Sequence, residues 1–210
     1  MTQPQRIPTT LTASADVLAE AVRRLVEVTV RTQASGDSVL ASAAAIDAVT
    51  ALLDVDLRTG PWVPDQSDPQ PSPYNAVVGT GNPVAPPVQL TTRTVDGVTG
   101  TVTFRSAYEG APGLVHGGML ALVLDQLFGE AGVAAGVGGM TVKLEIRYAA
   151  PTPVHQELHL EARVEQSDER LVRMAGSIRH GETTTATATA TFFRLTEDHA
   201  RRLFPHLVRE

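Results

Sequence analysis

The stretch of sequence that decides the fold reads His116-Gly-Gly-Met-Leu-Ala-Leu-Val-Leu-Asp-Gln-Leu-Phe128. Almost every residue after the two glycines is apolar, which predicts one long helix over residues 115–134 that is buried on all sides. Asp125 interrupts this apolar run. A carboxylate inside such a helix is unfavourable unless it is paired, hydrogen-bonded or facing a polar cleft. We therefore interpret Asp125 as a functional residue rather than as a structural one that braces a neighbouring loop.

Gly117 and Gly118 stand at the start of the predicted helix, directly after His116. The N–H groups of a first helical turn have no partners within the helix, and they lie at the positive end of the helix dipole. Because glycine keeps side chains away, these groups can polarise a carbonyl or hold an oxyanion. His116 can either brace the turn by hydrogen bonds or move protons, and the sequence leaves both roles open.

The residues on either side of the predicted helix favour strands. Asp96-Gly97 between two strand-like stretches is typical of a β-hairpin. Consecutive hairpins form an antiparallel sheet, so the predicted fold class is α+β, a curved sheet wrapped around one central helix. The predicted strands cover residues 89–95, 98–106, 140–149, 157–166, 170–180 and 182–195.

Alternation within two of these strands predicts which face each residue occupies. Apolar residues at even positions from Met140 to Tyr148 form one face, whereas Thr141 falls with Lys143 and Arg147 on the polar face. In the last strand, alanines at 186, 188 and 190 form one face, which allows another element to approach closely, and threonines form the other.

The chain divides into three predicted parts. Residues 1–55 carry two helices, over 11–32 and 38–54, that form a helical hairpin. Residues 56–89 are a proline-rich extended linker, with Trp62 and Tyr74 as expected anchors. Residues 90–210 form the main domain, which a short helix over 197–208 closes.

Composition narrows the classes of partner. The chain has 17 Lys+Arg, 23 Asp+Glu and a net charge of −6, with no basic block, which argues against nucleic acid or an anionic membrane as partner. The absence of cysteine excludes disulfides, Cys-ligated zinc and a thiol nucleophile. The histidines show no metal-ligand spacing, so we expect no metal and no cofactor. No targeting signal is recognisable, and the apolar stretches look too short to span a bilayer, so we expect a cytoplasmic protein.

The His116-Gly117-Gly118 turn, followed nine residues after the histidine by Asp125, resembles the hotdog-fold acyl-CoA thioesterases of the phenylacetate-pathway (PaaI) and THEM4-like type. Residues 82–87, 108–113 and 139–153 also resemble segments of that family, so the resemblance covers roughly residues 80–195. It implies hydrolysis of an acyl-CoA thioester in a hotdog fold. The resemblance also implies a role for each site residue. Asp125 is the general base or nucleophile, and the amide N–H of Gly118 donates a hydrogen bond to the thioester carbonyl, with Gly117 as a second candidate donor. His116 orients the turn, and Thr141 positions the attacking water.

Helix geometry adds an inference about assembly. Gly118 and Asp125 are seven residues apart, about 10 Å along a helix axis, which is too far for both to act on one thioester carbon. An antiparallel second chain would bring Gly118 of one subunit to Asp125 of the other, so we expect a homodimer or a dimer of dimers. Four arginines, at positions 105, 147, 170 and 179, can contact the phosphates of CoA. We expect most of them to be solvated.

Two other classes remain open. One is a non-catalytic hotdog protein that binds acyl-CoA or an aromatic ligand, since fold does not fix function. The other is a hotdog dehydratase or hydratase, whose different His/Asp pattern we do not find.

Overall fold

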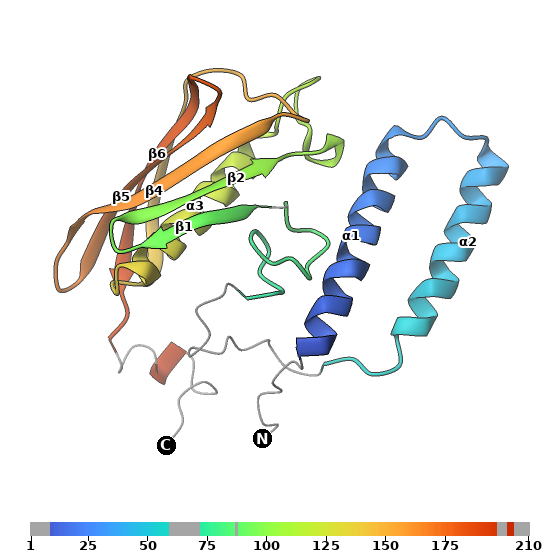
Figure 1. Cartoon of the computed structure of the whole chain (residues 1–210), viewed down its shortest axis with the longest axis horizontal. Helices are drawn as coiled ribbons and strands as arrows, with labels where there is room; N and C mark the ends of the chain where they lie inside the picture. The colour runs from blue at the N-terminus through green and yellow to red at the C-terminus, as the bar shows by residue number, and fades with distance from the viewer. Residues whose placement is uncertain (1–8, 59–71, 87, 197–200, 204–210) are drawn as a thin grey trace.

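The computed structural model describes residues 9–58, 72–86, 88–196 and 201–203, and it shows a curved sheet over one long helix with two further helices to one side (Figure 1). All strand pairs of the six-stranded sheet are antiparallel, in the order β1-β2-β4-β5-β6-β3. The expected α+β class is therefore confirmed. The strands are β1 (Gln89–Thr94), β2 (Gly97–Thr103), β3 (Gly139–Tyr148), β4 (Glu157–Ser167), β5 (Leu171–His180) and β6 (Thr183–Arg194).

The expected hairpin connects β1 and β2. Its turn residues are Val95 and Asp96, one position earlier than expected, and Gly97 lies opposite Thr94 as the first residue of β2. Gly97 has a φ of +150°, a backbone conformation that L-residues with a side chain rarely adopt. Glycine at this position therefore lets the chain reverse directly into the next strand.

The long helix α3 (Gly117–Ala134) lies against the inner face of the sheet. Leu124, Leu127 and Phe128 are fully buried in the core, and the alanines of β6 at 186, 188 and 190 belong to the same core, as their spacing predicted. The prediction that this helix is buried on all sides is wrong, because Gly118, Leu122 and Val133 are exposed along one stripe. The sheet covers only one side of α3, so the stripe on the other side is left open.

Strand β3 lies at one edge of the sheet and pairs with β6. Its register shifts between Thr141 and Lys143, which marks a β-bulge. A bulge reverses the side-chain alternation on one side of it, so the predicted face of residues 140–142 is wrong. Met140 and Val142 are 45% and 60% exposed, although they were expected on the apolar face.

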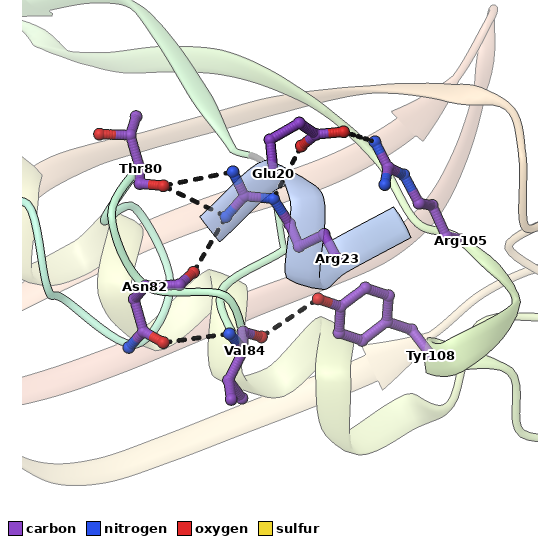
Figure 2. Close-up of polar contacts among 7 residues, drawn as sticks. All are labelled: Glu20, Arg23, Thr80, Asn82, Val84, Arg105 and Tyr108. Atoms are coloured by element: carbon purple, nitrogen blue, oxygen red, sulfur yellow. Dashed lines mark hydrogen bonds and ion pairs between the residues drawn. The ribbon is translucent and has the colours of Figure 1, made fainter. Parts of the chain in front are cut away.

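Two helices precede the domain, α1 (Thr9–Arg31) and α2 (Gly36–Leu53), and they run antiparallel to each other as the expected hairpin does. Polar contacts hold α1 to the domain (Figure 2). The Glu20 carboxylate lies 2.7 Å from Arg105 and 2.9 Å from Arg23, and Arg23 also donates to the backbone carbonyls of Thr80 and Asn82. Thus α1 also fixes the described part of the proline-rich segment.

Three other expectations concern the flanking segments. Tyr74 is half-buried, with Arg58 over its ring, whereas Trp62 lies outside the described residues. Of the expected helix over 197–208, only residues 201–203 are described, and they are helical. The boundaries of the three parts stay a prediction.

Within the part of the chain that the structure describes, two helices, α2 and α3, are long and apolar enough to cross a membrane by length and composition alone, which is weak evidence for a membrane span. The expectation that no apolar stretch is long enough is therefore wrong. Of the two, α3 is the core helix under the sheet, a position that explains its apolar character. None of the residues of α2 is buried.

Candidate active site

The start of α3 is organised by His116, which is the N-cap residue of the helix. Its Nδ1 accepts a hydrogen bond of 3.0 Å from the N–H of Gly118. A ring nitrogen that accepts carries no proton, so the neutral ring is protonated on Nε2. The structure therefore gives His116 an orienting contact and directs the N–H of Gly118 at this side chain.

Gly117 is the first residue of α3, and its N–H has no partner within the helix. No hydrogen bond among the described residues uses this N–H. Gly117 and His116 line a cavity of about 510 Å³ together with Tyr148, and apolar residues such as Leu114 and Leu120 form much of the rest of its wall. The donor that remains available at this helix start is therefore the N–H of Gly117.

Asp125 lies halfway along α3 and is half-buried. Its Oδ1 accepts a 2.8 Å hydrogen bond from the Thr141 hydroxyl. Alternation along β3 predicted that Thr141 faces away from the helix, but the bulge after it places this side chain on the helix side. The structure thus brings Asp125 and Thr141 together, while the water-positioning role that the resemblance implied for Thr141 stays a prediction.

The five predicted site residues form two groups in one chain. His116, Gly117 and Gly118 make the helix start, while Asp125 lies further along α3 and meets Thr141 of β3. Gly117 and Asp125 are eight residues apart, about 12 Å along the axis. The cavity at the helix start is lined by Gly117 but not by Asp125.

A buried polar chain beside the site escaped the sequence analysis. Gln126 accepts from the Asn75 side chain and donates to Glu130 Oε1, and Glu130 Oε2 lies 2.9 Å from Arg93 as an ion pair. Glu130 is only 7% exposed. Glu130 is a second acidic residue within the same apolar helix, so the sequence did contain a feature by which this residue could have been singled out. Its pairing with Arg93 gives it a structural partner, whereas the described partner of Asp125 is the Thr141 hydroxyl.

A second residue that the analysis did not single out is Tyr148, the last residue of β3. Its hydroxyl donates a 3.0 Å hydrogen bond to the carbonyl of Gly117. The even-position alternation of this strand placed Tyr148 on the helix side, so its face was predictable. Its contact with the helix start was not.

The other candidate groups lie elsewhere. Arg105 is paired with Glu20 of α1, and Arg147 lines a second cavity of about 450 Å³ on the sheet, away from the helix start. Within the described part of the chain, no group of three or more His, Cys, Asp or Glu side chains is placed to hold a metal ion.

Comparison with known proteins agrees with this architecture. The model of the Thioesterase superfamily matches residues 112–191, which include α3 and most of β3 to β6. A crystal structure of a thioesterase superfamily protein superposes with a TM-score of 0.76 at 28% identity, covering 92% of this chain and 94% of that one. An acetyl-CoA-bound protein from Streptococcus mutans shares the fold at 18% identity and a TM-score of 0.50, over 51% of this chain and 88% of its own.

Two curated relatives match part of the chain. Acyl-coenzyme A thioesterase THEM5 of Mus musculus is 32% identical over 89 residues, and THEM4 of Xenopus laevis is 35% identical over 89 residues. Each match covers 41% of this chain, and 36% and 40% of the respective relatives. The chain thus spans well under half the length of these relatives. Residues 112–191 are therefore similar to the Thioesterase superfamily, and the fold is that of its solved members.

Proposed function

We propose that this protein hydrolyses an acyl-CoA thioester to a free acid and CoA. The observation that carries the proposal is the pair of groups along α3: an unoccupied N–H at Gly117 and a carboxylate at Asp125 that a hydroxyl holds in place. The relatives named acyl-coenzyme A thioesterases support the substrate class.

Each group has a defined part in the reaction. The N–H of Gly117, at the positive end of the α3 dipole, donates to the thioester oxygen and stabilises the negative charge that develops there. Asp125 either takes a proton from the attacking water or attacks the carbonyl carbon itself, and CoA then leaves as its thiolate. In the second case the acyl group remains on Asp125 as a mixed anhydride, which water hydrolyses to the free acid and the carboxylate. The Thr141 hydroxyl orients the Asp125 carboxylate through its hydrogen bond to Oδ1.

The donor role moves from Gly118, where the sequence analysis put it, to Gly117. The N–H of Gly118 already donates to His116 Nδ1, whereas Gly117 lines the cavity and its N–H has no partner within the helix. His116 is an orienting residue in this mechanism and transfers no proton.

The distance of about 12 Å between Gly117 and Asp125 requires a second chain. The exposed stripe of α3 contains Leu122, with the half-buried Asp125 beside it, and the adjacent edge strand β3 exposes Met140 and Val142. An antiparallel copy placed here would cover these apolar side chains and pair the open edge. It would also bring Gly117 of each subunit to Asp125 of the other, which makes two shared sites.

Asp125→Asn tests the proposal in an assay of thiol release from short, long and aromatic acyl-CoAs. We expect kcat to fall at least about 100-fold, because the base or nucleophile is lost. The matched control is Glu130→Gln, the other acid of α3, which should keep its turnover per folded protein but lose about 3 kcal/mol of stability as a buried ion pair breaks. Full turnover by folded Asp125→Asn contradicts the proposal. Binding of acyl-CoA by the wild type without any thiol release would favour the non-catalytic alternative.

A further inference from the structure

We propose that Tyr148 is a positioning residue that sets the direction of the Gly117 N–H. The inference rests on the proposed function and adds a residue to it that acts through the backbone of the helix start.

The contact between Tyr148 and Gly117 is close in two ways. The Tyr148 hydroxyl donates to the Gly117 carbonyl at 3.0 Å. The ring also lies against the glycine: a Cβ at position 117 would come within 3.3 Å of the ring Cζ and of the hydroxyl oxygen. A side chain at 117 would therefore push the ring away from the carbonyl that it holds.

The Gly117–Gly118 peptide is held at both of its ends. Its carbonyl accepts from Tyr148, and its N–H donates to His116 Nδ1 at 3.0 Å. The preceding peptide is held through the His116 carbonyl, which accepts from the N–H of Met119 at 2.9 Å. These three bonds fix the two peptide planes around Gly117 and leave its own N–H as the donor without a partner.

The orientation of that donor matters because a hydrogen bond weakens steeply as its angle departs from linearity. Without the Tyr148 hydroxyl, the Gly117–Gly118 peptide keeps its bond to His116 and the helical bonds of α3 but loses one restraint on its carbonyl, and the glycines impose little restraint of their own. The Gly117 N–H belongs to the preceding peptide, which meets this one at the Gly117 Cα, so a looser Gly117–Gly118 plane lets that N–H sample directions that do not meet the thioester oxygen. Since the charge on that oxygen develops in the transition state, the loss falls on kcat rather than on KM.

Strand β3 contributes to both halves of the candidate site. Thr141, before the bulge, holds Asp125, and Tyr148, at the other end of the strand, holds Gly117. A single edge strand thereby orients the carboxylate and the amide donor of one chain, which serve different sites in the proposed dimer.

The test is Tyr148→Phe, which removes the hydroxyl and keeps the ring. We expect kcat for acyl-CoA hydrolysis to fall about five-fold, the effect of one hydrogen bond, with KM unchanged within about two-fold. The matched control is Tyr108→Phe. The Tyr108 hydroxyl donates to the Val84 carbonyl at 3.1 Å, a bond of the same kind away from the helix start (Figure 2). This variant should keep the kcat of the wild type, and thermal unfolding of both variants should show folded protein at the assay temperature.

Three results would overturn the positioning role: an unchanged kcat in Tyr148→Phe, a rise in KM alone, or an equal loss of kcat in Tyr108→Phe. The wild type and Asp125→Asn are assayed alongside. Turnover that Asp125→Asn abolishes and Tyr148→Phe leaves intact rejects the role of Tyr148 and keeps the proposed function. Absence of turnover in the wild type rejects both.

Discussion

His116 shows how one side chain can determine which backbone group is available for chemistry. Its Nδ1 takes the N–H of Gly118, and the N–H of Gly117 remains. Asparagine at an N-cap also accepts from the second or third N–H of a helix, whereas leucine cannot. We therefore expect His116→Leu to lose about 1 kcal/mol of stability and most of its kcat, and His116→Asn to retain much of both. Urea denaturation and the thiol-release assay check this. Equal activity of the leucine variant and the wild type would contradict an orienting role.

At the scale of elements, the attachment of α1 to the domain is mainly polar. The hydrogen bond from Arg105 lowers the pKa of Glu20 more than partial burial raises it, and Arg23 lowers it further. Burial raises the pKa of Glu27, but hydrogen bonds from Ser106 and Arg31 outweigh it and leave the pKa of Glu27 lowered. Both carboxylates therefore hold α1 in place in their charged forms.

This attachment predicts a pH dependence. The pKa of Glu20 in the folded protein lies below its ordinary value of 4.5, so its contribution to stability is present above pH 4.5 and is lost as the pH falls through the folded value. We expect Glu20→Gln to lower the free energy of unfolding at pH 7 by at most about 1 kcal/mol, because the side chain is 43% exposed. The difference from the wild type should shrink in urea titrations at pH 4 and below.

The control for Glu20 is Glu145→Gln. Glu145 pairs with Lys143, but both side chains are more than 60% exposed. This variant should match the wild type at every pH. A loss at pH 7 as large as that of Glu20→Gln would show that the α1 contact is no stronger than an ordinary surface pair.

At the scale of the whole molecule, the proposed function implies that one chain lacks a complete site, and complementation tests this directly. Gly117→Val crowds Tyr148 and the amide donor, and Asp125→Asn removes the carboxylate, so each variant alone should be nearly inactive. After the two are denatured together and refolded, a mixed dimer keeps one site with both native groups. We expect about half of the wild-type activity per mixed dimer. No recovery in a sample whose mixed dimers are demonstrated, for example by differently tagged chains, would exclude shared sites.

Short-range patterns in the sequence were enough to predict the central helix with its acid, its start at the two glycines and an antiparallel sheet, although not the order of the strands. These features depend on residues a few positions apart, so periodicity and turn chemistry report them directly. The resemblance carried by His116 and Asp125 likewise led to the superfamily that the comparisons support.

Tertiary structure alone decided which groups meet. The bulge in β3 arises from its pairing with β6, and it turns Thr141 toward Asp125 against the alternation of its own strand. Tyr148 reaches Gly117 across 31 residues of chain, and only the ion pair with Arg93 of β1 gives Glu130 a structural role. The open stripe of α3 follows from a sheet that covers one side of the helix. Each of these depends on contacts between segments far apart in sequence, which no local pattern of residues contains.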